Sequence, residues 1–264
     1  MMFNGKKTLN RDAHNFKHYL CSIYLYIYLL LITLLTMQEN WFKTWFDTTY
    51  YHTLYKHRDY SEASLFMDNI TTLLNLKENA KCWDLCCGKG RHSIYLNKKG
   101  FNVTGTDLSE QSIIEANTHA NETLEFYTHD MRNLFRTNYF DSVFNIFTSF
   151  GYFDKKHDDV NVFKSVEKAL KPNGYFVFDF LNETYVKKHL IETESKTIDG
   201  ITFHISKKNE NNTVVKSIDF TTEKKDFHFE ERVKLFNKAY FEELAEASNL
   251  KVINSKFKNN KNKM

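Results

Sequence analysis

The chain has 264 residues, which is enough for one large domain with its own hydrophobic core and does not require two domains. Its formal net charge of +3 is too small to indicate a nucleic-acid partner. Five lysines lie in residues 251–264, which we expect to be a solvated tail, and a single proline, Pro172, excludes a proline-rich linker.

Residues 19–37 contain no charged side chain and follow four lysine and arginine residues. This stretch is near the lower length limit for a transmembrane helix. Three interpretations remain open. It is a membrane anchor, or a helix packed on the protein or a partner, or part of an extension over residues 1–36 that does not belong to the functional protein, with Met37 as its true start.

Four cysteines, Cys21, Cys82, Cys86 and Cys87, show no paired C-x-x-C spacing. We therefore expect reduced, packed thiols in a cytoplasmic protein and no metal site. An anchor at residues 19–37 would send the following residues out of the cytosol under the positive-inside rule, which conflicts with unpaired cysteines. Membrane anchoring through this stretch stays the alternative localisation.

Residues 37–59 are rich in aromatic side chains. They form either a lid helix and loop over a ligand or a cover for a sheet. Tyr55 and Arg58 are the pair of interest here, because an arginine can hold a carboxylate through two hydrogen bonds. Apolar residues then recur with a helical period over residues 61–76, behind Ser61 as a cap.

The stretch from Cys82 to Asp107 is the most informative part of the chain. A short apolar run ends at Asp84, a glycine turn follows, residues 91–99 can form a helix, and residues 101–106 can form a second strand before Asp107. This is a β-α-β unit. Ligands bind at the carboxyl ends of parallel strands, where a glycine turn lets the backbone approach them. The unit predicts a site for a nucleoside-containing cofactor.

The glycine pattern indicates which cofactor is bound. A dinucleotide fingerprint needs a third glycine, but Ser93 stands three residues after Gly90. Asp84, just before the turn, suits a cationic amino-acid end better than a pyrophosphate. A nicotinamide-dependent Rossmann reductase is therefore the less favoured interpretation.

The rest of the chain alternates strands with helices, which predicts an α/β fold with a doubly wound, mostly parallel, Rossmann-like sheet. Ser109 looks like the cap of a helix that runs to about residue 120. The further expected elements are strands at 124–128, 140–147 and 175–180, a helix at 154–170 and a turn at 171–174.

After Asn182 the pattern changes to short strands at 201–207, 214–220 and 227–236, which predict an antiparallel β insert or lid. A helix at 239–248 and a last strand at 250–257 follow. The expected division is an extension at 1–36, a cofactor domain at 37–182, the insert at 183–237, the returning domain at 238–257 and a Lys/Asn-rich tail at 258–264.

Five motifs occur in order: Asp84–Ser93 (DLCCGKGRHS), Gly105–Ser109 (GTDLS), His129–Arg132 (HDMR), Phe147–Phe153 (FTSFGYF) and Leu170–Gly174 (LKPNG). With these residues the chain resembles the class I S-adenosylmethionine-dependent methyltransferases of the bacterial small-molecule type. The resemblance extends over about residues 37–257. It implies S-adenosyl-L-methionine as the cofactor and in-line transfer of its methyl group to an acceptor.

The resemblance also implies roles for the first two motifs. Asp84, Gly88 and Gly90 would surround the methionine moiety of the cofactor. Asp107 would accept hydrogen bonds from both ribose hydroxyls, with Leu108 beside it.

For the later motifs, the resemblance implies that Asp130 accepts a hydrogen bond from the adenine amino group while Met131 flanks the ring. Phe147 and the residues up to Gly151 would border the methyl group. The expected cofactor-binding set is Tyr55, Arg58, Asp84, Cys86, Gly88, Gly90, Asp107, Leu108, Asp130, Met131 and Phe147.

Two features depart from the family pattern. Cys86 occupies the place of the first glycine, and a cysteine there is strained if the backbone needs a positive φ. The family also ends with a seventh strand inserted between the fifth and sixth, which we expect this chain to lack because it stops soon after the sixth, so two sheet edges would stay unpaired. A non-catalytic relative, truncated or tethered to a membrane, is therefore the alternative function.

The acceptor is expected to be a small molecule. The loop after the fourth strand lacks the Pro-Pro-Tyr type motif of base-amino methyltransferases, and no basic, aromatic-interleaved patch indicates nucleic acid. The insert would select the acceptor. A hydroxyl acceptor would need a base, for which His92, His129 and Tyr152 are candidates by location only. The acceptor atom and the oligomeric state do not follow from the sequence.

Overall fold

The structure is a computed structural model that describes residues 28, 41–56 and 60–255. The chain divides into two compact units, Met1–Trp41 and Phe42–Met264, and the description below concerns the second. The apolar stretch at 19–37 lies outside the described residues, apart from the exposed Tyr28. Within the described ranges, no helix combines the length and the apolar character that a bilayer span requires.

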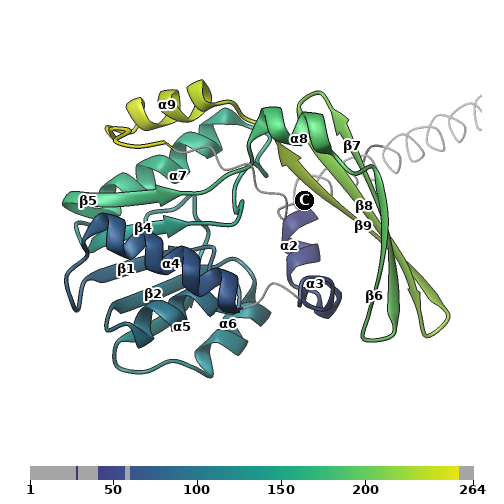
Figure 1. The fold of residues 1–264 in the computed structure, drawn as a ribbon, viewed down its shortest axis with the longest axis horizontal. Helices are drawn as coiled ribbons and strands as arrows, with labels where there is room; N and C mark the ends of the chain where they lie inside the picture. The colour runs from purple at the N-terminus through teal and green to yellow at the C-terminus, as the bar shows by residue number, and fades with distance from the viewer. Residues whose placement is uncertain (1–27, 29–40, 57–59, 256–264) are drawn as a thin grey trace, which may run out of the picture. The chain divides into compact units, whose positions relative to one another are not determined.

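A five-stranded parallel sheet forms the centre of this unit (Figure 1). Its strand order is β3-β2-β1-β4-β5, so successive crossovers run in one direction from β1 to β3 and in the other from β4 to β5. The carboxyl ends of β1 and β4 meet where the order reverses, which is where such sheets bind ligands. The strands are β1 (Lys81–Leu85), β2 (Asn102–Asp107), β3 (Leu124–Thr128), β4 (Phe140–Asn145) and β5 (Leu170–Phe178).

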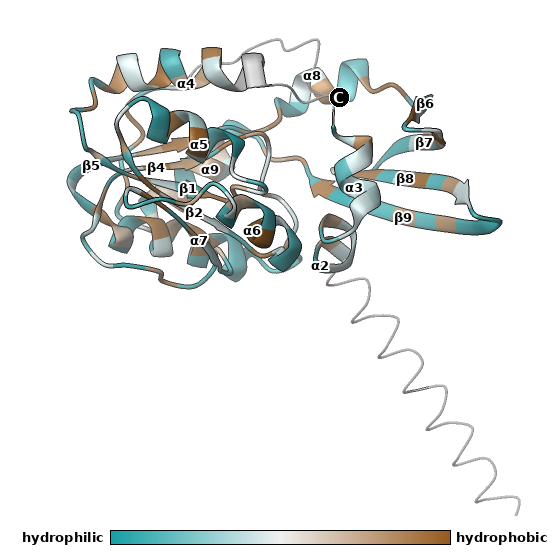
Figure 2. Ribbon diagram, turned by 90° about the horizontal axis from the view of Figure 1, so that it is seen from below, coloured by the Kyte–Doolittle hydropathy of each residue, from teal (hydrophilic) through white to brown (hydrophobic). Residues whose placement is uncertain are grey.

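Helices cover both faces of the sheet, which confirms the doubly wound α/β prediction. In Figure 2, α4 and α5 lie over one face and α7 lies under the other. Helix α4 packs on α5, and α7 packs on α9. The helices are α2 (Trp41–Phe46), α3 (Thr49–Leu54), α4 (Tyr60–Leu74), α5 (Arg91–Lys98), α6 (Glu110–Asn117), α7 (Lys156–Ala169), α8 (Glu183–His189) and α9 (Lys238–Glu246).

The two central strands are buried along almost their whole length, as their apolar sequences predict. Trp83 of β1 is fully buried and stacks on Phe140 of β4, with ring centroids 5.3 Å apart. Its indole N–H donates to the Thr106 hydroxyl of β2 at 2.9 Å. The polar atom of a large core side chain is thus satisfied inside the sheet, which leaves the ring free to pack.

The insert is an antiparallel meander of four strands, β6 (Thr193–Ile198), β7 (Ile201–Glu210), β8 (Thr213–Thr222) and β9 (Lys225–Lys234). Each hairpin turn consists of two residues with positive φ: Asp199-Gly200, Asn211-Asn212 and Glu223-Lys224. This is the geometry that suits the twist of the flanking strands. The sequence analysis missed β6, although Asp199-Gly200 is a strong hairpin signal.

Two further predictions were wrong in detail. Residues 250–255 form no strand, and Val252 and Ile253 are exposed there, because the segment pairs with no neighbouring strand. The expected turn at 171–174 lies inside β5 as an irregularity. The pairing moves from Phe140↔Leu170 to Ser142↔Tyr175, an advance of two residues in β4 against five in β5.

A buried carboxyl joins the two helices on one face of the sheet. Asp159 of α7 is 1 % exposed and accepts a hydrogen bond from the Tyr240 hydroxyl of α9 at 2.6 Å. Burial raises the pKa of Asp159 to about 6, although the bond from Tyr240 opposes this change. Because the pKa in the folded protein is raised, the protonated carboxyl stabilises the fold, and this stabilisation is lost as the pH rises through about 6.

Asp159→Asn removes this titration. As the pH rises from 4 to 8, the wild type should lose up to about 3 kcal/mol in free energy of unfolding relative to the variant. The reason is that the Asp159 carboxyl must ionise inside the core, whereas an asparagine does not ionise. Urea unfolding at the two pH values measures this difference. Asp154→Asn, at an exposed position, is the control and should keep the wild-type pH dependence. Parallel pH curves for wild type and Asp159→Asn would contradict the assignment.

Candidate functional site

The loop after β1 contains three residues with left-handed backbone, Cys86 (φ 66°), Gly88 (φ 54°) and Gly90 (φ 79°). Cys86 therefore carries the strain that its place in the glycine pattern suggested. A Cβ on Gly90 would lie 2.6 Å from the ring of Phe126, whereas a Cβ on Gly88 would meet nothing within 4 Å. Gly90 thus allows close packing, while Gly88 keeps its backbone open on the side where a ligand would approach.

Asp84 lies at the end of β1 and is 1 % exposed. The Ser93 hydroxyl of α5 donates to one of its carboxylate oxygens at 2.6 Å. Burial raises the pKa of Asp84 to about 6, and the bond from Ser93 partly offsets this change. Ser93 therefore has a role that the sequence analysis missed: it orients Asp84 from the position where a dinucleotide fingerprint has glycine.

Asp107, at the end of β2, joins two loops. Its carboxylate accepts the Gly88 N–H at 2.8 Å through one oxygen and the Ser109 N–H at 2.9 Å through the other. Burial raises the pKa of Asp107, and the backbone donors oppose that change. Each carboxylate oxygen can accept a second hydrogen bond, so Asp107 can hold the glycine turn and still accept bonds from a diol.

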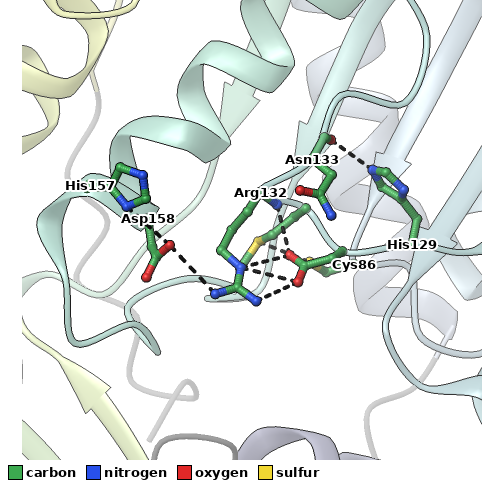
Figure 3. Close-up of polar contacts among 8 residues, drawn as sticks. Cys86, His129, Arg132, Asn133, His157 and Asp158 are labelled. Atoms are coloured by element: carbon green, nitrogen blue, oxygen red, sulfur yellow. Dashed lines mark hydrogen bonds and ion pairs between the residues drawn. The ribbon is translucent and has the colours of Figure 1, made fainter.

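The loop after β3 contains Asp130 and Met131, followed by Arg132 (Figure 3). Arg132 surrounds the Asp130 carboxylate: its Nη2 lies 2.6 Å from one oxygen, and its Nε and backbone N–H each lie 3.0 Å from the other. Burial opposes ionisation of Asp130, but these bonds outweigh it and hold the pKa of Asp130 below its usual value. The Met131 sulfur lies 3.5 Å from the Cys86 thiol, so this loop touches the loop after β1.

Arg132 also connects this loop to the other side of the site. Its guanidinium lies 4.7 Å from the ring centroid of Phe153 and 3.6 Å from the carboxylate of Asp158 on α7. His129, by contrast, is half-buried, with its Nε2 at 2.9 Å from the Asn133 carbonyl oxygen (Figure 3) and its ring 5.0 Å from that of Phe135. Sequence reasoning missed the role of Arg132, although its spacing from Asp130 allows this local pair.

The loop after β4 is strained. Phe147 and Thr148 are consecutive residues in the left-handed region, with φ of 60° and 63°. Such a conformation costs about 1–2 kcal/mol for each residue and persists only where the surroundings impose it. Asp179, just after β5, imposes it here: its carboxylate accepts the Phe147 N–H at 3.0 Å, and its carbonyl accepts the Thr148 N–H at 3.2 Å.

Two of the candidate bases lie next to this loop. The buried His92 ring of α5 stacks on Phe147, with centroids 5.0 Å apart. The Tyr152 hydroxyl donates to the Thr148 carbonyl at 2.8 Å, and its ring lies 5.6 Å from that of Phe46. His92 and Tyr152 therefore both contact the loop after β4.

The predicted pair Tyr55 and Arg58 is only half described. Arg58 lies outside the described residues. The Tyr55 hydroxyl donates to the Glu231 carboxylate at 2.7 Å and contacts the Lys216 ammonium, so these contacts link Tyr55 to the insert. In the part of the chain that the structure describes, no three His, Cys, Asp or Glu side chains are placed to hold a metal ion.

Comparison with known proteins agrees with this arrangement. Residues 83–174 match the model of a methyltransferase domain family, and this range includes all four strand-end loops just described. Residues 83–174 are thus similar to a methyltransferase domain. The resemblance seen in the sequence is thereby confirmed.

Curated relatives match the chain over part of its length. The chain is 35% identical over 134 residues to the putative methyltransferase YqeM of Bacillus subtilis, covering 49% of the chain and 51% of the relative. It is 30% identical over 117 residues to a ubiquinone biosynthesis O-methyltransferase of Hydrogenovibrio crunogenus, covering 43% and 47%. The chain thus spans about half the length of the curated relatives it matches.

Solved structures show the same fold. An S-adenosylmethionine-dependent methyltransferase from Clostridium acetobutylicum superposes with a TM-score of 0.65 at 24% identity, over 78% of this chain and 86% of that one. CalS10, an amino pentose methyltransferase from Micromonospora echinaspora solved with S-adenosylmethionine, has a TM-score of 0.62 at 15% identity, over 76% and 88%. At such identities the likeness concerns the fold alone.

The two glycines of the turn should respond differently to substitution. We expect Gly90→Ala to cost about 3 kcal/mol or more in free energy of unfolding, because the left-handed penalty adds to the clash with Phe126. Gly88→Ala has the same backbone penalty without the clash and should cost about 1 kcal/mol. Urea unfolding measures both. Phe126→Leu should recover part of the loss in Gly90→Ala; equal costs for the two alanine variants would exclude the clash as the cause.

Proposed function

We propose that this protein transfers a methyl group from S-adenosylmethionine to a small-molecule acceptor. The observation that carries the proposal is the carboxylate of Asp107 at the end of β2, hydrogen-bonded to the glycine turn of the neighbouring β1. An acid held in this way against an open glycine backbone suits a ligand that presents a ribose diol beside the turn. A sheet of this order binds ligands at the same edge.

The residues at the four strand ends fit the parts of the cofactor. The ionised Asp84 would favour a cationic amino-acid end, and Gly88 would let the backbone approach it. Asp107, with Leu108 beside it, would accept the ribose hydroxyls. Asp130, already oriented by Arg132, would accept the adenine amino group. Met131 would flank the adenine ring, with its sulfur beside that of Cys86.

The protein's part in the reaction is to align the acceptor and exclude water. When bound, S-adenosylmethionine supplies a methyl group on a positively charged sulfur, so the difficult chemistry belongs to the cofactor. The strained loop at Phe147 and Thr148 would border that methyl group. Phe42 and Phe46 of α2 lie 6.0 Å and 5.6 Å from the Tyr152 ring, and they would shield the reacting atoms on that side.

An amine or thiol acceptor would need no strong base, whereas a hydroxyl acceptor would. Of the three candidates, His92 and Tyr152 contact the loop after β4, whereas the His129 ring contacts Phe135 and the Asn133 carbonyl instead. We therefore retain His92 and Tyr152 and set His129 aside.

Two lines of support favour a small acceptor. Structural neighbours include an amino pentose methyltransferase and a sugar N-methyltransferase, and the curated relatives include O-methyltransferases of ubiquinone biosynthesis. The antiparallel insert at β6–β9 would select the acceptor, because added elements set specificity on a shared scaffold. Three free thiols in the described part of the chain suit the cytoplasm, where the cofactor is made.

Calorimetric titration of the full chain with S-adenosylhomocysteine tests the cofactor assignment. We expect micromolar binding of this ligand and none of NADH, the control. Asp107→Ala should weaken the binding by about thirtyfold, or about 2 kcal/mol, through loss of charge-assisted hydrogen bonds. Asp226→Ala, at an exposed position in the β8–β9 hairpin, is the matched control and should bind as wild type. A folded wild-type protein that ignores S-adenosylhomocysteine would contradict the proposal.

The pH dependence of binding tests the role of Asp84. In the free protein this carboxyl ionises near pH 6, so affinity for a cationic amino-acid end should rise as the pH increases from 5 to 7. Ser93→Ala removes the hydrogen bond that favours the ionised form, so the midpoint should move to higher pH. Asp84→Asn should remove the step. A flat profile in the wild-type protein would show that Asp84 does not contact the charged end.

A further inference from the structure

Residues 42–56, here called the strap, contact the cofactor-binding edge from a distant part of the sequence. The Asp47 carboxylate, between α2 and α3, accepts the Ser109 hydroxyl at 2.7 Å and the Gln111 backbone N–H at 3.1 Å. Both donors belong to the first turn of α6, more than sixty positions along the chain from Asp47. A carboxylate at this end of a helix is stabilised by the free N–H groups and the helix dipole.

A second strap residue meets the same helix. The His52 ring of α3 lies with Nε2 3.5 Å from the Ser112 hydroxyl of α6. Burial lowers the pKa of His52 to about 4, and the nearby charge of Lys89 adds to this effect. The ring is therefore neutral at neutral pH, and Asp47 carries the charge by which the strap holds the start of α6.

Ser109 connects the strap to the site through two hydrogen bonds. Its backbone N–H donates to the Asp107 carboxylate at 2.9 Å, while its hydroxyl is within 2.7 Å of Asp47. The same hydroxyl also caps α6 by accepting the Ser112 N–H at 3.1 Å. Ser109 thus links two carboxylates, Asp47 of the strap and Asp107 of the site.

The charge of Asp47 acts on Asp107 as well as on the start of α6. Asp47 adds its negative charge to the surroundings of Asp107, which disfavours two ionised carboxylates side by side. A neutral asparagine or serine could cap Gln111 without that repulsion. Because the Ser109 hydroxyl donates to Asp47, this carboxylate also holds the residue whose backbone N–H binds Asp107.

We propose that Asp47 is a positioning residue for the proposed ribose-binding carboxylate Asp107, acting through Ser109. The inference rests on the proposed function. It adds a residue that no cofactor motif contains and assigns the strap a part in cofactor binding.

The test uses the full chain, calorimetry and two ligands, S-adenosylhomocysteine and its 2′-deoxy analogue. Wild type should prefer the ribose form because Asp107 accepts its hydroxyls. Asp47→Asn should weaken S-adenosylhomocysteine binding about tenfold but hardly change that of the deoxy analogue, so the preference largely disappears. Asp47→Glu, which keeps the charge, should restore part of the preference. Melting without ligand should stay within about 2 °C of wild type, which checks the fold.

Asp199→Asn is the matched control. Asp199 pairs with Lys56 of the strap at 2.9 Å, but both side chains are more than half exposed, so its loss should leave binding unchanged. Equal weakening of both ligands by Asp47→Asn, or no weakening, would overturn the inference while leaving the cofactor assignment intact. Failure of wild type to bind S-adenosylhomocysteine would instead contradict the proposed function. If Asp47→Asn does not fold, Asp47→Ser takes its place: loss of the ribose preference in the folded variant supports the inference, and an unchanged preference overturns it.

Discussion

The hydrogen bond from the Gly88 N–H to the Asp107 carboxylate joins the first two strand ends of the sheet, and the candidate site depends on it. It requires β1 and β2 to lie in register, with Asp84 opposite Gly105. It also requires the ring of Phe126 to fit against Gly105 and Gly90, where a Cβ would lie 2.6 Å from that ring. The close packing of Phe126 therefore helps to set the positions of Asp84 and Asp107 at the two strand ends.

Several unfavourable features gather at this edge of the sheet. Asp84 is buried, and Cys86, Phe147 and Thr148 have left-handed backbone. Such features persist only where surrounding contacts compensate for them. Here Ser93 holds Asp84, while Asp179 binds the backbone of the loop after β4. The core of stacked rings around Trp83 provides the rigid support, as expected for a site built on strand ends.

The strap contacts both the start of α6 and the insert. Asp47 binds the start of α6, and Trp45 and Tyr55 donate to Glu231 of the insert at 2.7 Å each. Glu231 and its partner Lys216 are only 13% exposed, so this attachment is largely protected from water. The aromatic residues expected to lie over a ligand or on the sheet thus pack partly on the insert, as the Trp45–Phe229 contact at 4.4 Å shows.

The sequence alone determined the succession of strands and helices along the parallel part of the chain, the glycine turn and the strand-end acids Asp84, Asp107 and Asp130. Apolar runs, turn residues and local spacing are short-range signals, which a sequence contains in full. The sequence did not determine β6, whose residues alternate weakly, or the absence of a strand at 250–255, which depends on a pairing partner. Ser93 and Asp47 acquired roles only in the tertiary structure, because their partners are set by the packing of helices and loops, and Asp47 meets its partner from more than sixty positions away. Arg132 pairs locally with Asp130, but only the fold brings it to Phe153 and Asp158.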